Sequence, residues 1–79
     1  MAKRSRYRHV RALSRGLNVL AELNRVGRAR PGEIAAEVGI DRTTVYRLLD
    51  TLEHEGYVTR ASDEYYSLTF GVRRLSEGY

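Results

Sequence analysis

A short polar run at residues 42–47, RTTVYR, carries the side chains best suited to chemistry in this sequence. Arg42 and Arg47 each present several N–H donors, and an arginine can bond both major-groove acceptors of guanine at once. Thr43 can bond a base edge or contact a thymine methyl, and hydroxyl groups can also bind phosphate oxygens. These side chains predict contact with DNA, and the predicted set is Arg42, Thr43, Thr44, Tyr46 and Arg47.

The leucines around this run recur at the spacing of a buried helix face. Val45, Leu48, Leu49 and Leu52 follow the i, i+3, i+4, i+7 pattern, and the polar run falls on the opposite side. Acidic residues fill the second half of that side, where a DNA backbone would repel them. For an isolated helix, ordinary solvated surface would be the preferred interpretation, so the neighbouring segments decide. If this helix binds DNA, it must enter a groove by its N-terminal end.

The first of two earlier helices is predicted over residues 13–27. Ser14 is its candidate N-cap, because a serine hydroxyl can accept a hydrogen bond from an amide in the first turn. Leucine and valine residues give this segment a broad apolar stripe. Gly27 is expected to end the helix.

A second, shorter helix is predicted over residues 31–38, with Pro31 in the first helical position and Gly39 after its end. Asp41 then suits the N-cap of the third helix, and Ile40 and Val45 are placed to form a hydrophobic staple. Two helices joined by a short turn that contains glycine form the helix-turn-helix pattern.

The periodicity changes after Gly56, where two β-prone segments follow. These are YVTR at residues 57–60 and YYSL at residues 65–68, which predict a small hairpin. The residues expected to point inward are Val58, Tyr66 and Leu68.

The order of helix, helix-turn-helix, hairpin and final helix predicts a winged helix-turn-helix, a mainly α fold with a small β-hairpin. We expect a basic N-terminal arm at residues 1–9, the DNA-binding domain at residues 10–68 and a C-terminal linker helix at residues 69–79. The linker helix would carry its apolar residues on one face.

Positive charge is concentrated at the start of the chain. Residues 1–30 hold nine Lys or Arg and one acid, a net charge of +8, whereas residues 31–79 have a net charge of −4. Such a distribution favours a polyanionic partner. A disordered, solubilising tail explains residues 1–9 equally well. On the DNA interpretation, the arm residues that neutralise phosphates are Lys3, Arg4, Arg6 and Arg8.

Length and composition argue against several other classes. With 79 residues, the chain allows one domain and leaves no room for a deep catalytic pocket, so we do not expect an enzyme. It has no cysteine, and His9 and His54 are far apart, so we expect no metal and no cofactor. It has no apolar run of about 20 residues and no signal-peptide pattern. We therefore expect a soluble, cytoplasmic protein.

Three segments of the chain together resemble a known family. LSRGLNVLAEL, EIAAEVGIDRTTVYRLLDTLEHEGYV and YSLTFGVRRLSEGY are similar, in order and spacing, to the N-terminal DNA-binding domain of the IclR family of bacterial transcription regulators. The resemblance covers residues 10–79. Within the family, RTTVYRLL and VRRLSEGY look most like regulators of aromatic-acid catabolism.

The resemblance implies a dimeric module that binds an operator. The third helix would enter the major groove, and the wing and the N-terminal region would contact the backbone. Because Asp63 and Glu64 make the wing tip acidic, Arg60 and Ser62 are the better wing candidates. Arg30 stands where family members often have a Ser or Thr helix cap. The family's larger effector-binding domain has no counterpart in these 79 residues. Either the sequence is a fragment or the protein departs from the family plan, and in both cases we do not expect this chain to sense an effector.

Two apolar surfaces could support a homodimer. One is the terminal helix face of Val72, Leu75 and Tyr79, and the other is the outer side of the first helix around Val19, Leu23 and Val26. The competing hypothesis is a winged helix that binds a partner protein through a large exposed apolar patch.

Overall fold

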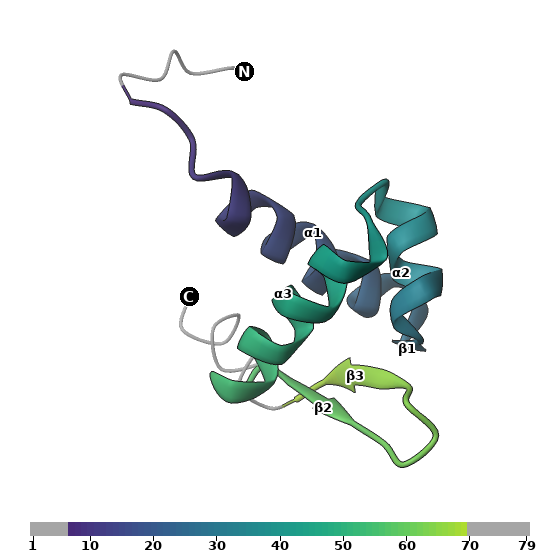
Figure 1. Ribbon diagram of the computed structural model, residues 1–79. Helices are drawn as coiled ribbons and strands as arrows, with labels where there is room; N and C mark the ends of the chain where they lie inside the picture. Colours follow the sequence, from purple (N-terminus) through teal and green to yellow (C-terminus); the bar gives the residue numbers. More distant parts are fainter. Residues whose placement is uncertain (1–6, 70–79) are drawn as a thin grey trace.

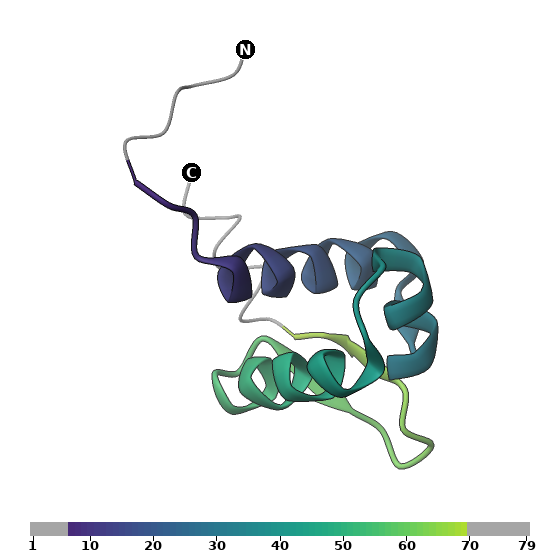
Figure 2. The same cartoon turned by 45° about the horizontal axis from the view of Figure 1, so that its top comes forward.

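Three helices and a small sheet alternate along the computed structural model, which describes residues 7–69. The elements are α1 (Arg11–Val26), β1 (Arg28–Ala29), α2 (Pro31–Val38), α3 (Arg42–His54), β2 (Val58–Arg60) and β3 (Tyr66–Leu68) (Figure 1). Figure 2 shows α1 and α3 one above the other, with α2 at one end and the β2–β3 loop projecting beyond α3. This arrangement confirms the predicted winged helix-turn-helix. The predicted helix at the C-terminus lies outside the described residues.

The start of α1 differs from the prediction. The helix begins at Arg11, and Ser14 is not its cap but lies inside its first turn. The amides of Leu13 and Ser14 both donate to the carbonyl of Val10, each at 3.1 Å. Arg11 and Ala12 are good helix formers, so the helix extends toward the N-terminus past the residue that could have capped it. The predicted end at Gly27 is confirmed, with a φ of 89° that favours glycine.

The caps of α2 and α3 show how the helix-turn-helix is fixed locally. The carboxylate of Glu33 accepts a hydrogen bond from the Arg30 amide at 2.8 Å, which forms half of a capping box. The other half is missing because an arginine side chain has no acceptor. At α3, the predicted N-cap is confirmed, since Asp41 accepts bonds from the amide of Thr44 at 2.9 Å and from its hydroxyl at 2.7 Å.

The hairpin is part of a three-stranded antiparallel sheet with the order β1–β3–β2. The predicted strands β2 and β3 pair Val58 with Leu68 and Arg60 with Tyr66. Strand β1 was not predicted, because two residues after a helix-ending glycine are too few to show a strand period. Its pairing with β3 ties the wing to the segment between α1 and α2.

One core lies under all of these elements. The residues with no exposed surface are Val19, Leu23, Ile34, Val45 and Leu49, and Val58 and Tyr66 extend the core into the sheet. The predicted dimer surface around Val19 and Leu23 is therefore wrong, because these side chains face the core. Val26, the third residue of that predicted surface, is exposed, and the other apolar residues that α1 and its N-cap leave exposed are Val10, Leu13 and Leu17. No helix within residues 7–69 combines the length and apolar character needed to cross a membrane.

Candidate nucleic-acid interface

The N-terminal half of α3 presents the predicted contact residues to solvent. Arg42, Thr43, Tyr46 and Arg47 are all exposed, and Tyr46 retains 45% of its accessible surface. Within the part of the chain that the structure describes, neither Arg42 nor Arg47 has an acidic oxygen within 4.0 Å. Both guanidinium groups are therefore free to bind an anion or a base edge without first breaking an ion pair.

Thr44 differs from Thr43, although both were predicted as DNA contacts. Its side chain is half-buried, and its hydroxyl hydrogen is donated to Asp41. The Thr44 hydroxyl, followed by the Thr44 amide, holds the pKa of Asp41 below its ordinary value. In this position the Thr44 hydroxyl stabilises the start of α3 and can offer an outside partner only its lone pairs, whereas Thr43 is exposed.

Arg42 lies against the first turn of α2. If Gly32 had a side chain, its Cβ would be only 2.9 Å from an Arg42 guanidinium nitrogen. Arg42 and Tyr46 line a shallow pocket there with Arg30 and with Glu64 of the wing loop. The start of α2, the start of α3 and the tip of the wing thus meet on one surface. Nothing in the sequence indicated that a small residue in α2 gives Arg42 its place.

Arginines of the segment between α1 and α2 contact the wing in a way that the sequence did not predict. The Arg28 Nη2 atom lies 2.6 Å from the Asp63 Oδ2 atom, and its guanidinium stacks 4.1 Å from the centroid of the Tyr65 ring. Arg30 also lies over that ring, at 4.9 Å. The amide of Tyr65, followed by the Arg28 guanidinium, holds the pKa of Asp63 below its ordinary value. The acidic wing tip is therefore partly neutralised from within the protein.

The predicted wing contacts lie beside these arginine contacts. Arg60 and Ser62 are both exposed, Arg60 at the end of β2 and Ser62 in the loop that follows. Burial raises the pKa of the Tyr66 phenol, and the adjacent Arg60 guanidinium partly opposes that rise. Arg8 is exposed ahead of α1. The remaining predicted residues lie outside the described range, and they are Lys3, Arg4, Arg6, Val72, Leu75 and Tyr79.

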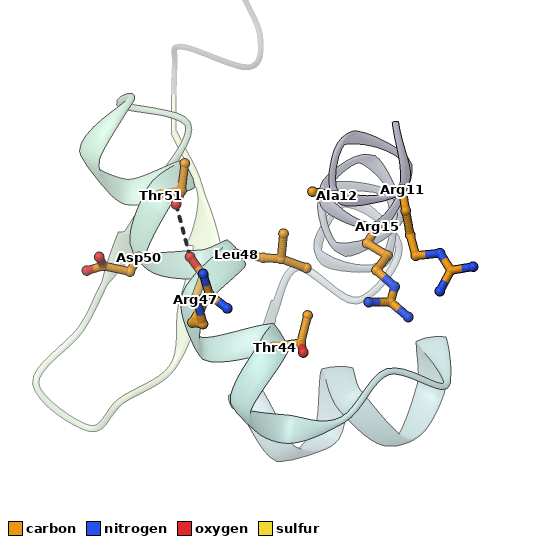
Figure 3. A pocket seen from close by; sticks show the side chains of 8 residues that line it. All are labelled: Arg11, Ala12, Arg15, Thr44, Arg47, Leu48, Asp50 and Thr51. Carbon is orange, nitrogen blue, oxygen red and sulfur yellow. Dashed lines mark hydrogen bonds between the residues drawn. The ribbon is translucent and has the colours of Figure 1, made fainter. Parts of the chain in front are cut away.

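A further pair of arginines flanks α3 on the side of α1. Arg11 and Arg15 line an open groove of about 530 Å³, and Thr44 and Arg47 line it from α3 (Figure 3). The four-residue spacing of Arg11 and Arg15 places them on one helix face, and this spacing was visible in the sequence. The sequence did not show which way that face points, because its direction depends on how α1 packs on α3.

Comparisons with known proteins agree with this architecture. Residues 12–62, more than half of the chain, match the family model of the IclR helix-turn-helix domain. The fold is similar to an IclR family transcriptional regulator from Brucella abortus, with 34% identity and a TM-score of 0.84 over 90% of this chain. It is also similar to a putative transcriptional regulator from Rhodococcus sp. RHA1, with 32% identity and a TM-score of 0.78 over 90% of this chain.

The share of each relative's own chain that is covered by the match differs between the relatives. The chain spans only 28% of the Brucella abortus protein and 28% of the Rhodococcus protein. By contrast, it matches 95% of the Zalpha domain of Cyprinid Herpesvirus3 ORF112, a domain solved in its binding mode to Z-DNA. That match has 26% identity and a TM-score of 0.69 over 72% of this chain.

Proposed function

This chain belongs to the IclR helix-turn-helix family of DNA-binding transcription regulators, and from that membership we propose that it recognises a specific operator in double-stranded DNA. The observation that carries the proposal is the exposed N-terminal half of α3, where Arg42 and Arg47 have no acidic partner among residues 7–69. Unpaired cations in the first turns of a helix favour binding to a polyanion such as DNA, with the N-terminal end of the helix in a groove.

In the proposed complex, α3 enters the major groove by its N-terminal end. At least one of Arg42 and Arg47 reads a guanine, because the arginine fork matches the two acceptors on its major-groove edge. Thr43 and Tyr46, which lie between the two arginines in the sequence, contact bases or phosphates. Thr44 contributes indirectly, because its bonds to Asp41 stabilise the start of α3. The acidic second half of α3 stays away from the backbone. Arg60 and Ser62 contact phosphates from the wing.

The N-terminal arm adds affinity that is independent of sequence. Lys3, Arg4, Arg6 and Arg8 neutralise phosphates in this proposal, and each contact contributes about 0.9 to the slope of log affinity against log salt concentration. Deleting residues 1–8 is expected to lower that slope and to weaken binding to all duplexes alike. An unchanged slope would remove the arm from the interface.

We further propose that the protein binds as a homodimer on a palindromic site. A single recognition helix reads only a few base pairs, which is too little to select one site in a genome. Two-fold symmetry doubles the site and imposes half-site centres about 34–36 Å apart, or a multiple of that distance. The candidate dimer faces are the C-terminal residues Val72, Leu75 and Tyr79 and the exposed stripe of Leu13 and Leu17 on α1.

The dimer proposal is tested by the concentration dependence of binding. A full palindrome should bind more steeply in protein concentration than a half-site does. Leu75→Glu and Leu17→Glu, measured separately, should identify the face that produces this steepness, because only the variant at the dimer face should lose it. Identical curves for full and half sites with the unmutated protein would mean that it binds as a monomer.

The place of this domain in a regulator is also a proposal. RTTVYRLL and VRRLSEGY favour the branch of the family that controls aromatic-acid catabolism, and such a regulator would act in the cytoplasm. The effector would bind to a larger domain, of the kind that the remaining length of the relatives accommodates. If the selected operator sequence does not occur beside genes for aromatic-acid breakdown, the branch assignment is wrong.

The experiment that tests the function itself is a selection from random duplexes, followed by a footprint of the enriched sequence. A preferred B-form site contacted in the major groove supports the proposal. A winged helix that binds a partner protein is the alternative, and such a protein should give no enrichment and should leave a DNA column at low salt. A preference for a duplex held in the Z form would also contradict the proposed major-groove contact.

A further inference from the structure

A second cationic surface lies beside α3, on the side that faces α1. Arg11 and Arg15 line the groove there from α1, and Thr44 and Arg47 line it from α3. Figure 3 shows the guanidinium groups of Arg11 and Arg15 on the same side of α1, near each other. Leu48 points from α3 toward α1 and is an apolar residue of the lining. Because Arg11 and Arg15 are one turn apart, both guanidinium groups can approach the same ligand.

The charges around the groove are unbalanced. Three arginines line it, and the one acidic residue in its lining, Asp50, points away from α1 (Figure 3). Within residues 7–69, neither Arg11 nor Arg15 has an acidic oxygen within 4.0 Å. Arg25, at the other end of α1, differs in this respect, since its Nη2 atom lies 2.7 Å from a carboxylate oxygen of Glu22. The cations at the groove therefore form no ion pair within residues 7–69, whereas the arginine at the far end is already paired. Arg15 is nevertheless near enough to Asp41 to add to the Thr44 hydroxyl in lowering the pKa of that carboxyl.

The shape of the groove favours a strand over an enclosed small molecule. It is open to solvent along one side, whereas small-molecule sites enclose most of their ligand. Arg47 borders the groove and also belongs to the proposed DNA-reading face of α3. A DNA strand that borders the major groove occupied by α3 would therefore run past Arg47 toward α1.

We propose that Arg11 and Arg15 bind a backbone phosphate of that strand and so clamp α1 against the DNA edge. The inference rests on the proposed function, because it needs α3 in the groove. A guanidinium fork matches two phosphate oxygens and forms short, charge-assisted hydrogen bonds with them. Contacts of this kind carry no sequence information, but they fix the position and angle at which a recognition helix enters. Arg11 and Arg15 thus set the register in which Arg42 and Arg47 meet the bases.

The test measures salt-dependent binding to a duplex of mixed, non-palindromic sequence. The variants are Arg11→Gln, Arg15→Gln and the double variant, and Arg25→Gln on the same helix is the control with the same change in charge. Loss of one phosphate contact should lower the slope of log affinity against log salt by about 0.9. Affinity should fall several-fold for every sequence alike, while Arg25→Gln should leave both quantities unchanged.

The Arg11→Lys/Arg15→Lys variant provides a second readout, because it keeps the charge and loses the fork. It should retain the salt slope, and if it loses the slope as the glutamine variants do, the phosphate assignment is wrong. Arg11 is exposed, so Arg11→Gln should melt at the temperature of the unmutated protein and gives a result even if Arg15→Gln unfolds. An unchanged slope in the folded glutamine variants would overturn the inference and leave the proposed function intact. No binding by the unmutated protein would overturn both.

Discussion

The start of α3 and the wing use arginine in opposite ways. At the start of α3, Arg42 and Arg47 are exposed and have no acidic partner among residues 7–69. Beside the wing, Arg28 is bonded to Asp63 and stacked on Tyr65, and Arg30 lies over the same ring. Both regions carry arginines in the sequence. In the structure, Arg42 and Arg47 have no acidic partner among residues 7–69, whereas Arg28 and Arg30 are held by contacts with Asp63 and Tyr65.

From this difference we infer that the contacts an arginine already makes within the protein decide whether it can bind DNA. An arginine that already stacks on a ring and bonds a carboxylate must give up those contacts, or share them, before it can bind a phosphate. We therefore expect changes at α3 to alter DNA binding and leave the fold intact, and changes at Arg28 to act first on the wing. Each of the following experiments tests one part of that contrast.

The largest expected effect is a loss of stability on mutation of the core that lies under both α3 and the wing. Leu49 has no exposed surface and belongs to the core cluster that also contains Val58 and Tyr66 of the wing. Leu49→Ala should lower the free energy of unfolding by about 2–5 kcal/mol, because it removes buried methyl groups and leaves a cavity. Leu17→Ala, on the exposed side of α1, should change it by about 0.5 kcal/mol or less. Denaturant unfolding measures the free energy of unfolding of both variants. Equal losses of stability would contradict the assignment of Leu49 to the core and of Leu17 to the surface.

The next effect concerns the available cations. Arg42→Ala should weaken binding to the selected operator by about 1–3 kcal/mol and relax the preference at one base position in each half-site. Its melting temperature should not change, because the Arg42 guanidinium has no ion-pair partner within residues 7–69. Arg25→Ala provides the control at a paired arginine. If Arg42→Ala weakens binding to specific and random duplexes equally, Arg42 contacts the backbone and does not read a base.

A smaller effect is expected from mutation of Arg28, the arginine that is already paired with Asp63 and stacked on Tyr65. Arg28→Ala removes a guanidinium from the Tyr65 ring, and such an exposed stacking contact stabilises a protein by about 0.5–1 kcal/mol. The NMR signals of Tyr65 and Asp63 should shift and the wing amides should exchange faster. Arg60→Ala, across the sheet, should leave those signals in place. If Arg28→Ala moved neither residue yet weakened DNA binding as much as Arg42→Ala, the contrast between the two regions would fail.

The smallest expected effect is a difference in how added salt changes the pKa values of Asp41 and Asp63, two carboxylates whose pKa values are lowered. Asp63 owes its low pKa to the Tyr65 amide and to the Arg28 guanidinium, whereas the main partners of Asp41 are the neutral hydroxyl and amide of Thr44. Added salt should therefore raise the pKa of Asp63 more than that of Asp41, because salt screens charge pairs. NMR titration of the carboxyl carbons measures this shift, and equal responses would mean that the Arg28 charge is unimportant.

The sign of the pH dependence follows from the same two groups. Because the pKa of each is lower in the folded protein than in the unfolded chain, the stability that it contributes is present above the unfolded value. That contribution is lost as the pH falls through the folded value. Acid should loosen the start of α3 and the wing, and Asp63→Asn should remove only the wing's share of the effect.

The sequence by itself determined the order and the boundaries of most elements. Asp41 was predicted to begin α3, and Gly27 and Gly39 to end the first two helices, because a cap depends on residues within about one helical turn. The alternation after Gly56 likewise predicted the hairpin. The same local reasoning failed at Ser14, where a serine suited to capping was passed over because the residues before it continue the helix.

The contact face of α3 could be predicted in the same way, because its polar and apolar sides separate at the period of the helix itself. Arg42 and Tyr46 are exposed, and Val45 and Leu49 are buried, as that period required. Whether these exposed residues touch DNA stays a prediction. The role of Thr44 in holding the cap became visible only from the atoms that its hydroxyl meets.

Only the tertiary structure decided which distant segments meet. The pairing of β1 with β3, the bond between Arg28 and Asp63, and the placing of Arg11 and Arg15 beside Arg47 join segments far apart in the chain. Tertiary packing also turned Val19 and Leu23 inward, although the breadth of the α1 stripe allowed an outward face as well. The period of a helix fixes which residues share a side, but the direction of that side depends on how the helices pack around a common core.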